Sequence, residues 1–169
     1  RVQSMIYRRA GISLHDGKQA MVYSRLSRRL RDTGYQSFRD YLGWLESAEV
    51  PEWQEFVNAL TTNLTSFFRE SHHFDVFSEI LKSNGATTPI RVWCSAASTG
   101  EEPYSIAITV LESLGSETAV SITASDVDSK VLAAAQKGMY RLDGVKGVDP
   151  KRMQRFFFRG KGANEGWIR

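Results

Sequence analysis

The residues best suited to chemistry lie between positions 90 and 105, where a short apolar stretch passes through small residues into the start of a helix. The stretch 90–94 has the composition of a buried strand, and the next four side chains are small enough for a ligand to reach the backbone. Ser98 and Glu101 have the spacing of a capping box, so a helix should start there. This pattern predicts a ligand-binding turn between a strand and a helix.

A second strand pattern follows over 120–126 and ends in a carboxylate, Asp126. Nucleotide-binding βαβ units place the acid that holds a ribose at roughly this distance from the first strand. We therefore interpret the segment from 90 to 126 as a candidate nucleoside site.

Charge favours one kind of nucleoside. A pyrophosphate binds a helix N-terminus that is positive, whereas Glu101 and Glu102 occupy the first turn here and would repel it. A ligand with a ribose, no phosphate and positive charge fits better, and S-adenosylmethionine has these properties. The alternative is that both acids only complement the helix dipole.

Composition sets the frame for these motifs. With 169 residues, of which 41% are hydrophobic, the chain can form one domain or two small ones. No stretch approaches the roughly 20 apolar residues of a membrane span and no leader opens the chain, so we expect a cytoplasmic protein.

Cys94 cannot form an internal disulfide, and we interpret it as a small buried hydrophobe. His72 and His73 are adjacent and should face different sides of a helix, so we expect no metal site.

The basic residues concentrate in a predicted helix over 18–32. On a helical wheel Arg25, Arg28 and Arg31 lie opposite the apolar stripe, with Arg29 nearer its edge. This face is either simply solvated, or it docks to an acidic surface such as a carboxylate-rich helix or a nucleic-acid backbone.

Other predicted helices frame this one. One covers about 2–10, another is capped by Ser37, and a third opens at Pro51; together they should form a small bundle. In the segment 60–70, hydroxyl and amide side chains then interrupt the apolar pattern just before Arg69, and a further helix should end near Asn84 and Gly85.

Several segments together resemble one family closely, the chemotaxis receptor methyltransferases of the CheR type. The segments that carry the resemblance cover nearly the whole chain, and they are 23–30, 59–70 with 72–74, 91–107, 124–128 and 138–141. The resemblance implies an enzyme that moves a methyl group from S-adenosylmethionine to glutamate side chains, leaving S-adenosylhomocysteine. The partner it implies is the helical cytoplasmic domain of chemoreceptors, the methyl-accepting chemotaxis proteins, and in some members also a peptide at the receptor's tail. We expect neither a nucleic-acid partner nor membrane insertion.

The resemblance also implies roles for single residues. It places Asn63, Thr65 and Arg69 along the cofactor pocket, Glu102 at the methionine end of the cofactor and Asp126 at its ribose hydroxyls. We further expect Arg69 to be the catalytic residue that orients groups at the reacting centre. The basic helix would meet the receptor. The complete expected cofactor set is Asn63, Thr65, Arg69, Gly100, Glu102 and Asp126, and the expected receptor-binding set is Arg25, Arg28, Arg29 and Arg31.

The expected fold class is α/β. A small amino-terminal all-α domain for receptor docking (1–58) precedes linker helices that contribute to the cofactor site (59–88). The first half of a Rossmann-like methyltransferase domain follows (89–154), with a short helix expected after Asp149. A small antiparallel β subdomain then begins at 155–169 as a glycine-turned hairpin. The family's later strands, with a motif that closes the cofactor pocket, do not appear by Arg169, so we expect this chain alone to be inactive.

Two other functions remain open. A nucleotide-binding Rossmann-like module without catalysis would share the strand, the turn and Asp126, but it would not need the polar segment upstream. A nucleic-acid methyltransferase would use the arginine face on phosphates and would show a steep salt dependence.

Overall fold

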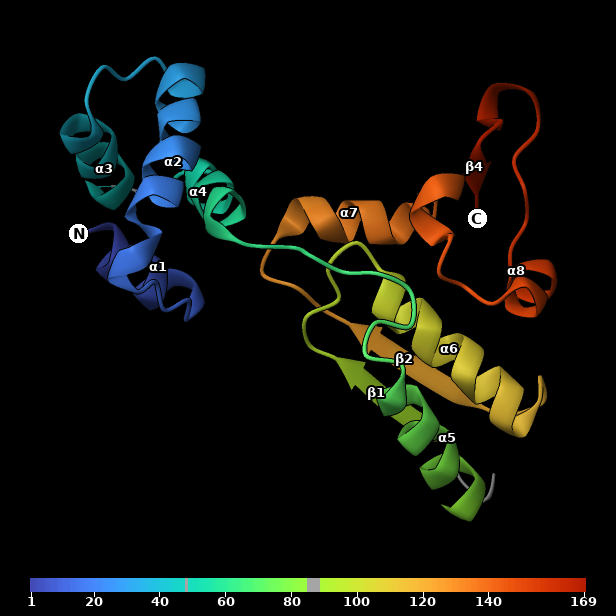
Figure 1. The fold of residues 1–169 in the computed structure, drawn as a ribbon. Helices are drawn as coiled ribbons and strands as arrows, with labels where there is room; N and C mark the ends of the chain where they lie inside the picture. The colour runs from blue at the N-terminus through green and yellow to red at the C-terminus, as the bar shows by residue number, and fades with distance from the viewer. Residues whose placement is uncertain (48, 85–88) are drawn as a thin grey trace. The chain divides into compact units, whose positions relative to one another are not determined.

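The computed structural model describes residues 1–47, 49–84 and 89–169 (Figure 1). These residues form two compact units. The first comprises Arg1–Thr62 and Val127–Ser129, and the second comprises Asn63–Asp126 and Lys130–Arg169. The four-segment division expected from the sequence stays a prediction. Among the described residues, no helix combines the length and apolar character that crossing a membrane requires.

The first unit is a helical bundle. Its helices are α1 (Val2–Ala10), α2 (Gln19–Thr33), α3 (Phe38–Ser47) and α4 (Glu52–Leu60), with a 3-10 turn at Asp16–Lys18. All four helices were expected from sequence within a residue or so. Their buried side chains form one core, which contains Met5, Ile6, Leu26, Tyr41, Leu42, Leu45, Phe56, Val57 and Leu60.

Local signals explain where these helices start and stop. The Ser37 hydroxyl accepts a hydrogen bond from the Asp40 backbone N–H at 3.1 Å, which satisfies one of the donors that a helix start leaves unpaired. Pro51 directly precedes α4. Gly34 ends α2 with a φ of 80°, a left-handed conformation that glycine adopts without a steric penalty.

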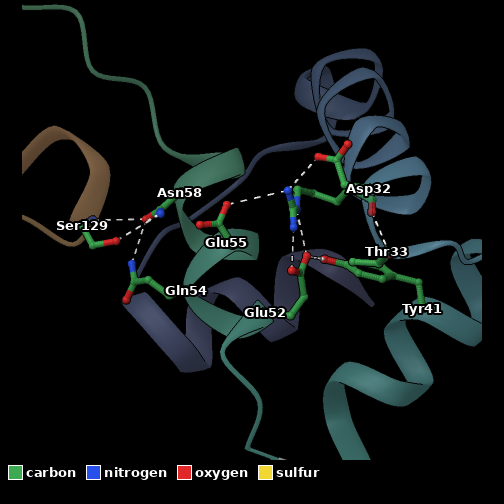
Figure 2. Close-up of polar contacts among 9 residues, drawn as sticks. Asp32, Thr33, Tyr41, Glu52, Gln54, Glu55, Asn58 and Ser129 are labelled. Atoms are coloured by element: carbon green, nitrogen blue, oxygen red, sulfur yellow. Dashed lines mark hydrogen bonds and ion pairs between the residues drawn. The ribbon is translucent and has the colours of Figure 1, made fainter. Parts of the chain in front are cut away.

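A polar network is buried inside this bundle (Figure 2). Glu52 is only 8% exposed, and its carboxylate lies 2.6 Å from Arg29 Nη2 and accepts a 2.8 Å hydrogen bond from the fully buried Tyr41 hydroxyl. Burial together with the Glu52 carboxylate raises the pKa of Tyr41 well above its usual value. Because a buried charge without a partner is costly, this pairing fixes how α2, α3 and α4 pack.

The second unit is built on a parallel strand pair. In the described part of the chain β1 (Ile90–Cys94) pairs with β2 (Val120–Ala124), in a register that aligns Val92 with Ile122. Helix α6 (Glu101–Leu114) connects the two strands, and α5 (His72–Asn84) packs against α6, with Ser78 Oγ 2.8 Å from Ser113 Oγ. The expected end of α5 is confirmed at Asn84, while Gly85 lies outside the described residues.

The expectation that 90–94 is buried throughout is wrong. Cys94 is buried, but Trp93 is 71% exposed and its indole N–H donates to Ser125 Oγ at 3.0 Å. Successive residues of a strand point to opposite faces. Val92 therefore faces the α5 and α6 side chains with which it lines a cavity, and Trp93 points away from them.

The remainder of the second unit is a short antiparallel arrangement. Helix α7 (Ser129–Lys137) leads to β3 (Tyr140–Arg141), and α8 (Pro150–Phe156) leads to β4 (Trp167–Ile168), which pairs antiparallel with β3. The Phe158 and Arg169 backbones exchange hydrogen bonds of 2.8 and 3.0 Å, so the expected hairpin is confirmed. Strand β3 was not expected from sequence. Short 3-10 turns at Leu142–Val145 and Gly162–Asn164 complete this part.

Candidate functional site

Ser98 joins two of the segments that were expected to bind a cofactor. Its backbone N–H donates to Asp126 Oδ2 at 2.8 Å, and its hydroxyl donates to the Asn63 carbonyl at 3.1 Å. Only 8% of Ser98 is exposed, so both bonds are partly shielded from water. The turn after β1, the end of β2 and the segment that begins at Asn63 therefore meet at one point of the second unit.

The turn after β1 has an unusual backbone. Ser98 has a φ of 48° and Gly100 a φ of 101°, and both values lie in the left-handed region. Non-glycine residues are rarely held in that region, and such strain concentrates at functional sites. The Ala97 N–H donates to the Ser125 carbonyl at 2.9 Å and so fixes the turn to the end of β2.

The expected capping box is wrong. Helix α6 begins at Glu101 with Gly100 as its N-cap, and no side chain caps it. The Ser98 hydroxyl bonds to Asn63 instead, because the left-handed backbone of Ser98 and Gly100 turns that side chain away from the helix start. The Glu101 carboxylate accepts from Thr99 Oγ1 at 2.6 Å.

Gly100 is required by its surroundings as well as by its φ. A Cβ atom at this position would lie 2.6 Å from Tyr140 Oη and 3.0 Å from Ala135 Cβ. The Tyr140 hydroxyl donates to the Thr99 carbonyl at 2.8 Å, and burial raises its pKa above the usual tyrosine value, with Glu101 adding to the shift. Sequence reasoning missed Tyr140 as a support of the turn, and its place in the segment 138–141 was the one available signal.

The segment before α5 is an ordered loop that holds Arg69. Phe68 and Glu70 have φ values of 52° and 55°, and the Phe68 N–H donates to Ser105 Oγ of α6 at 3.0 Å. Arg69 Nη1 donates to the Leu64 carbonyl at 3.0 Å, which folds the arginine back on its own loop. Ser105 is fully buried, and sequence reasoning did not single it out.

Arg69 and Glu102 line the same cavity. Its volume is about 220 Å³, and it is otherwise lined by His73, Phe74, Phe77, Val92 and Ile106. A guanidinium and a carboxylate above aromatic and aliphatic side chains can orient a ligand that has both charged and apolar parts.

Cys94 lies beside this cavity but is no nucleophile. Its thiol donates to Glu102 Oε1 at 3.3 Å, and burial together with this hydrogen bond raises its pKa to about 11. The thiolate is the reactive form, so the thiol stays protonated and inert near neutral pH. The sequence interpretation of Cys94 as a buried hydrophobe is confirmed.

All six expected cofactor residues belong to the second unit. Asn63, Thr65 and Asp126 are partly buried, Gly100 is buried, and Arg69 and Glu102 are exposed. A carboxylate offers about four acceptor positions, so Asp126 can hold Ser98 and still accept hydroxyl groups of a ligand. Among the described residues, no group of three histidine, cysteine or acidic side chains is arranged to hold a metal ion.

The expected arginine face is corrected in part. Arg28 and Arg31 are exposed, but Arg25 Nη1 donates to the Ala59 carbonyl at 3.3 Å and to the Thr61 carbonyl. The last carbonyls of a helix have no partner within it, and the long side chain of Arg25 reaches those of α4 from the edge of its own face. Arg29 bonds to Glu52 as described, so these two guanidinium groups support the bundle.

Comparisons with known proteins cover the whole chain. The model of the CheR methyltransferase all-alpha domain matches residues 1–61, and the model of the CheR methyltransferase SAM binding domain matches residues 63–168. The chain is 50% identical to the chemotaxis protein methyltransferase of Salmonella typhimurium and 48% identical to that of Escherichia coli, in both cases over its full length. It is 49% identical to chemotaxis protein methyltransferase 2 of Pseudomonas aeruginosa over 99% of its length. The chain spans 59% of the Salmonella and Escherichia proteins and 60% of the Pseudomonas protein.

Proposed function

Because the chain belongs to the CheR methyltransferase family and contains its S-adenosylmethionine-binding domain, we propose that the full-length protein methylates glutamate side chains of bacterial chemoreceptors. The coproduct is S-adenosylhomocysteine. The observation that supports this proposal is the pair of bonds from Ser98 to the Asp126 carboxylate and the Asn63 carbonyl, which brings two of the proposed cofactor residues to the turn that contains Gly100.

Each proposed role follows from the chemistry of the side chain. Asp126 accepts from the ribose hydroxyls, and Glu102 faces the positively charged methionine end of the cofactor. Asn63 and Thr65 supply side-chain groups that can form hydrogen bonds with the cofactor. Gly100 lets the turn pack against α7 and Tyr140, where a Cβ atom would clash.

The reaction needs placement more than acid or base catalysis. A receptor glutamate is ionised near neutral pH, so its carboxylate oxygen can attack the methyl carbon directly. The new C–O bond forms as the C–S bond breaks, and the sulfonium becomes a neutral thioether. Holding oxygen, carbon and sulfur in line can contribute about 7 to 11 kcal/mol.

Arg69 is the residue proposed to orient the reacting groups. A guanidinium has five donors, so Arg69 can keep its bond to the Leu64 carbonyl and also face a carboxylate. Its exposure is consistent with contact to a second protein.

Receptor binding is proposed for the first unit. Arg28 and Arg31 present exposed guanidinium groups on α2, which suits a receptor surface rich in carboxylates. Arg25 and Arg29 hold α2 against α4 and so support the helix that presents this surface. A partner of this kind is the helical cytoplasmic part of a chemoreceptor, so we propose that the protein acts in the cytoplasm. A peptide from the receptor's carboxyl terminus is a second proposed partner.

A methyl-transfer assay tests the proposal. Full-length protein and S-adenosylmethionine labelled in the methyl group are offered a chemoreceptor cytoplasmic domain, duplex DNA and RNA in parallel. We expect label on the receptor alone, in a form that alkali releases as methanol, because a glutamyl methyl ester is hydrolysed under those conditions. Label on DNA or RNA, or alkali-stable label on the receptor, would contradict the proposal.

A further inference from the structure

One face of α4 holds the connection between β2 and α7. Gln54 Nε2 donates to the Val127 carbonyl at 2.8 Å. Asn58 Oδ1 accepts from the Ser129 N–H at 3.2 Å (Figure 2). Asn58 Nδ2 also donates to Ser129 Oγ at 3.2 Å. A 2.8 Å bond from Gln54 Nε2 to Asn58 Oδ1 orients the two amides, which stand one turn apart on the helix. Two side chains therefore hold both ends of this connection.

Thr61 adds a third contact from the end of α4. Its hydroxyl donates to Asp128 Oδ2 at 2.7 Å, and Asp128 is only 3% exposed. Thr61 stands two residues before Asn63, and Asp128 stands two residues after Asp126. This bond therefore joins two segments of the first unit that are each followed or preceded, along the chain, by a residue of the proposed cofactor set.

We propose that Gln54 and Asn58 are positioning residues for the cofactor. By fixing residues 127–129 they restrain the backbone that directly follows Asp126, whose carboxylate accepts from the Ser98 N–H. A connection that is not held must become ordered when the ligand binds, and that entropy cost subtracts from the affinity. The inference rests on the proposed role of Asp126 at the ribose. It gives α4, which contacts no part of the cofactor in this proposal, an indirect effect on cofactor affinity.

The test begins with Asn58→Ala in the full-length protein, measured by calorimetric titration with S-adenosylmethionine. The change removes both bonds to Ser129, and we expect a roughly three- to tenfold weaker affinity. The KM for the cofactor should rise by the same factor, while kcat at saturating cofactor stays at the wild-type value. Asn58→Asp keeps an acceptor for each Ser129 donor and should restore the affinity.

Gln3→Ala is the matched control. Gln3 is also a helical amide that holds a loop, because its Nε2 donates to the Leu14 carbonyl at 2.8 Å and to Asp16 Oδ1 at 3.0 Å. If the loss of any loop contact weakened cofactor affinity, Asn58→Ala and Gln3→Ala would both weaken it. The proposal instead predicts that Gln3→Ala changes cofactor affinity by less than about twofold. Gln54→Ala is the substitute for Asn58→Ala if the latter fails to fold.

A double-mutant cycle separates this inference from the function on which it rests. If Asn58 acts through Asp126, Asn58→Ala should weaken binding no further in an Asp126→Ala background. Additive losses would refute the positioning role, and so would equal effects of Asn58→Ala and Gln3→Ala. Unchanged affinity in folded Asp126→Ala would instead refute the role of Asp126 itself.

Discussion

Gly100→Ala tests whether close packing behind the turn is essential. The substitution places a Cβ atom in a backbone with a φ of 101° and brings it within 2.6 Å of Tyr140 Oη and 3.1 Å of Ala135 Cα. A left-handed backbone costs a residue with a Cβ about 1 to 2 kcal/mol, and overpacking costs about 1 to 3 kcal/mol. We expect the free energy of unfolding to fall by about 2 to 5 kcal/mol, because the two effects act together.

Gly166→Ala separates the two costs. Gly166 belongs to the same unit and has a φ of 80°, but nothing lies within 4 Å of the position its Cβ would take. We expect this control to lose only the backbone part, about 1 to 2 kcal/mol. Both variants are measured by urea denaturation of the full-length protein without ligand, followed by fluorescence, together with calorimetric titration of S-adenosylmethionine. Gly100→Ala should also weaken cofactor affinity, because Gly100 is one of the proposed cofactor residues. Equal destabilisation by the two changes, or normal cofactor affinity in Gly100→Ala, would refute the packing argument.

Three further predictions concern the proposed site and surfaces. Asp126→Ala should weaken S-adenosylmethionine binding about 10- to 150-fold, because hydrogen bonds to a charged group contribute about 1.5 to 3 kcal/mol. Calorimetric titration measures this affinity, and wild-type affinity in a folded variant would show that Asp126 does not bind the cofactor. The double variant Arg28→Ala/Arg31→Ala should slow receptor methylation and reduce its salt dependence without changing cofactor affinity. Arg8→Ala/Arg9→Ala on α1 removes the same charge and should methylate receptor at the wild-type rate. The raised pKa of Cys94, about 11 against 9.0 for the free thiol, predicts that alkylation of the folded protein is half-maximal near pH 11. The thiol of the unfolded chain loses its proton at a lower pH than the thiol of the folded protein. The contribution of Cys94 to the free energy of unfolding is therefore complete below pH 9 and is lost as the pH rises towards 11. Cys94→Ala should not show this loss when its free energy of unfolding is measured over the same pH range.

Local signals made the elements predictable. The Ser37 cap, Pro51 before α4 and the left-handed Gly34 act within a few residues, so the helix boundaries in the first unit could be anticipated from sequence. The same holds for β1, α6 and β2, where apolar periodicity changes from that of a strand to that of a helix and back. Strand β3 was missed because it has only two residues, and its pairing with β4 depends on a segment far along the chain.

Side-chain partners were less predictable for the same reason. The spacing of Ser98 and Glu101 suggested a cap, but the left-handed backbone at Ser98 directs its hydroxyl to Asn63. The helical wheel placed Arg25 among solvated residues, although the exposed carbonyls at the end of α4 lie within its reach. A wheel describes one helix in isolation, and it contains no information about the carbonyls or carboxylates of a neighbouring helix.

The sequence by itself determined most of the helices, the strands β1 and β2, and the order of strand, turn, helix and acid. Those features depend on periodicity, caps and residue chemistry, which act over short distances along the chain. The six residues proposed to bind the cofactor came from the resemblance of the sequence to one family. Only the tertiary structure decided that Ser98 joins Asn63 to Asp126, that Tyr140 packs behind Gly100, and that α4 holds the connection after β2. Each of these contacts joins residues distant in sequence, so its geometry exists only once the chain has folded and the packing has fixed both partners.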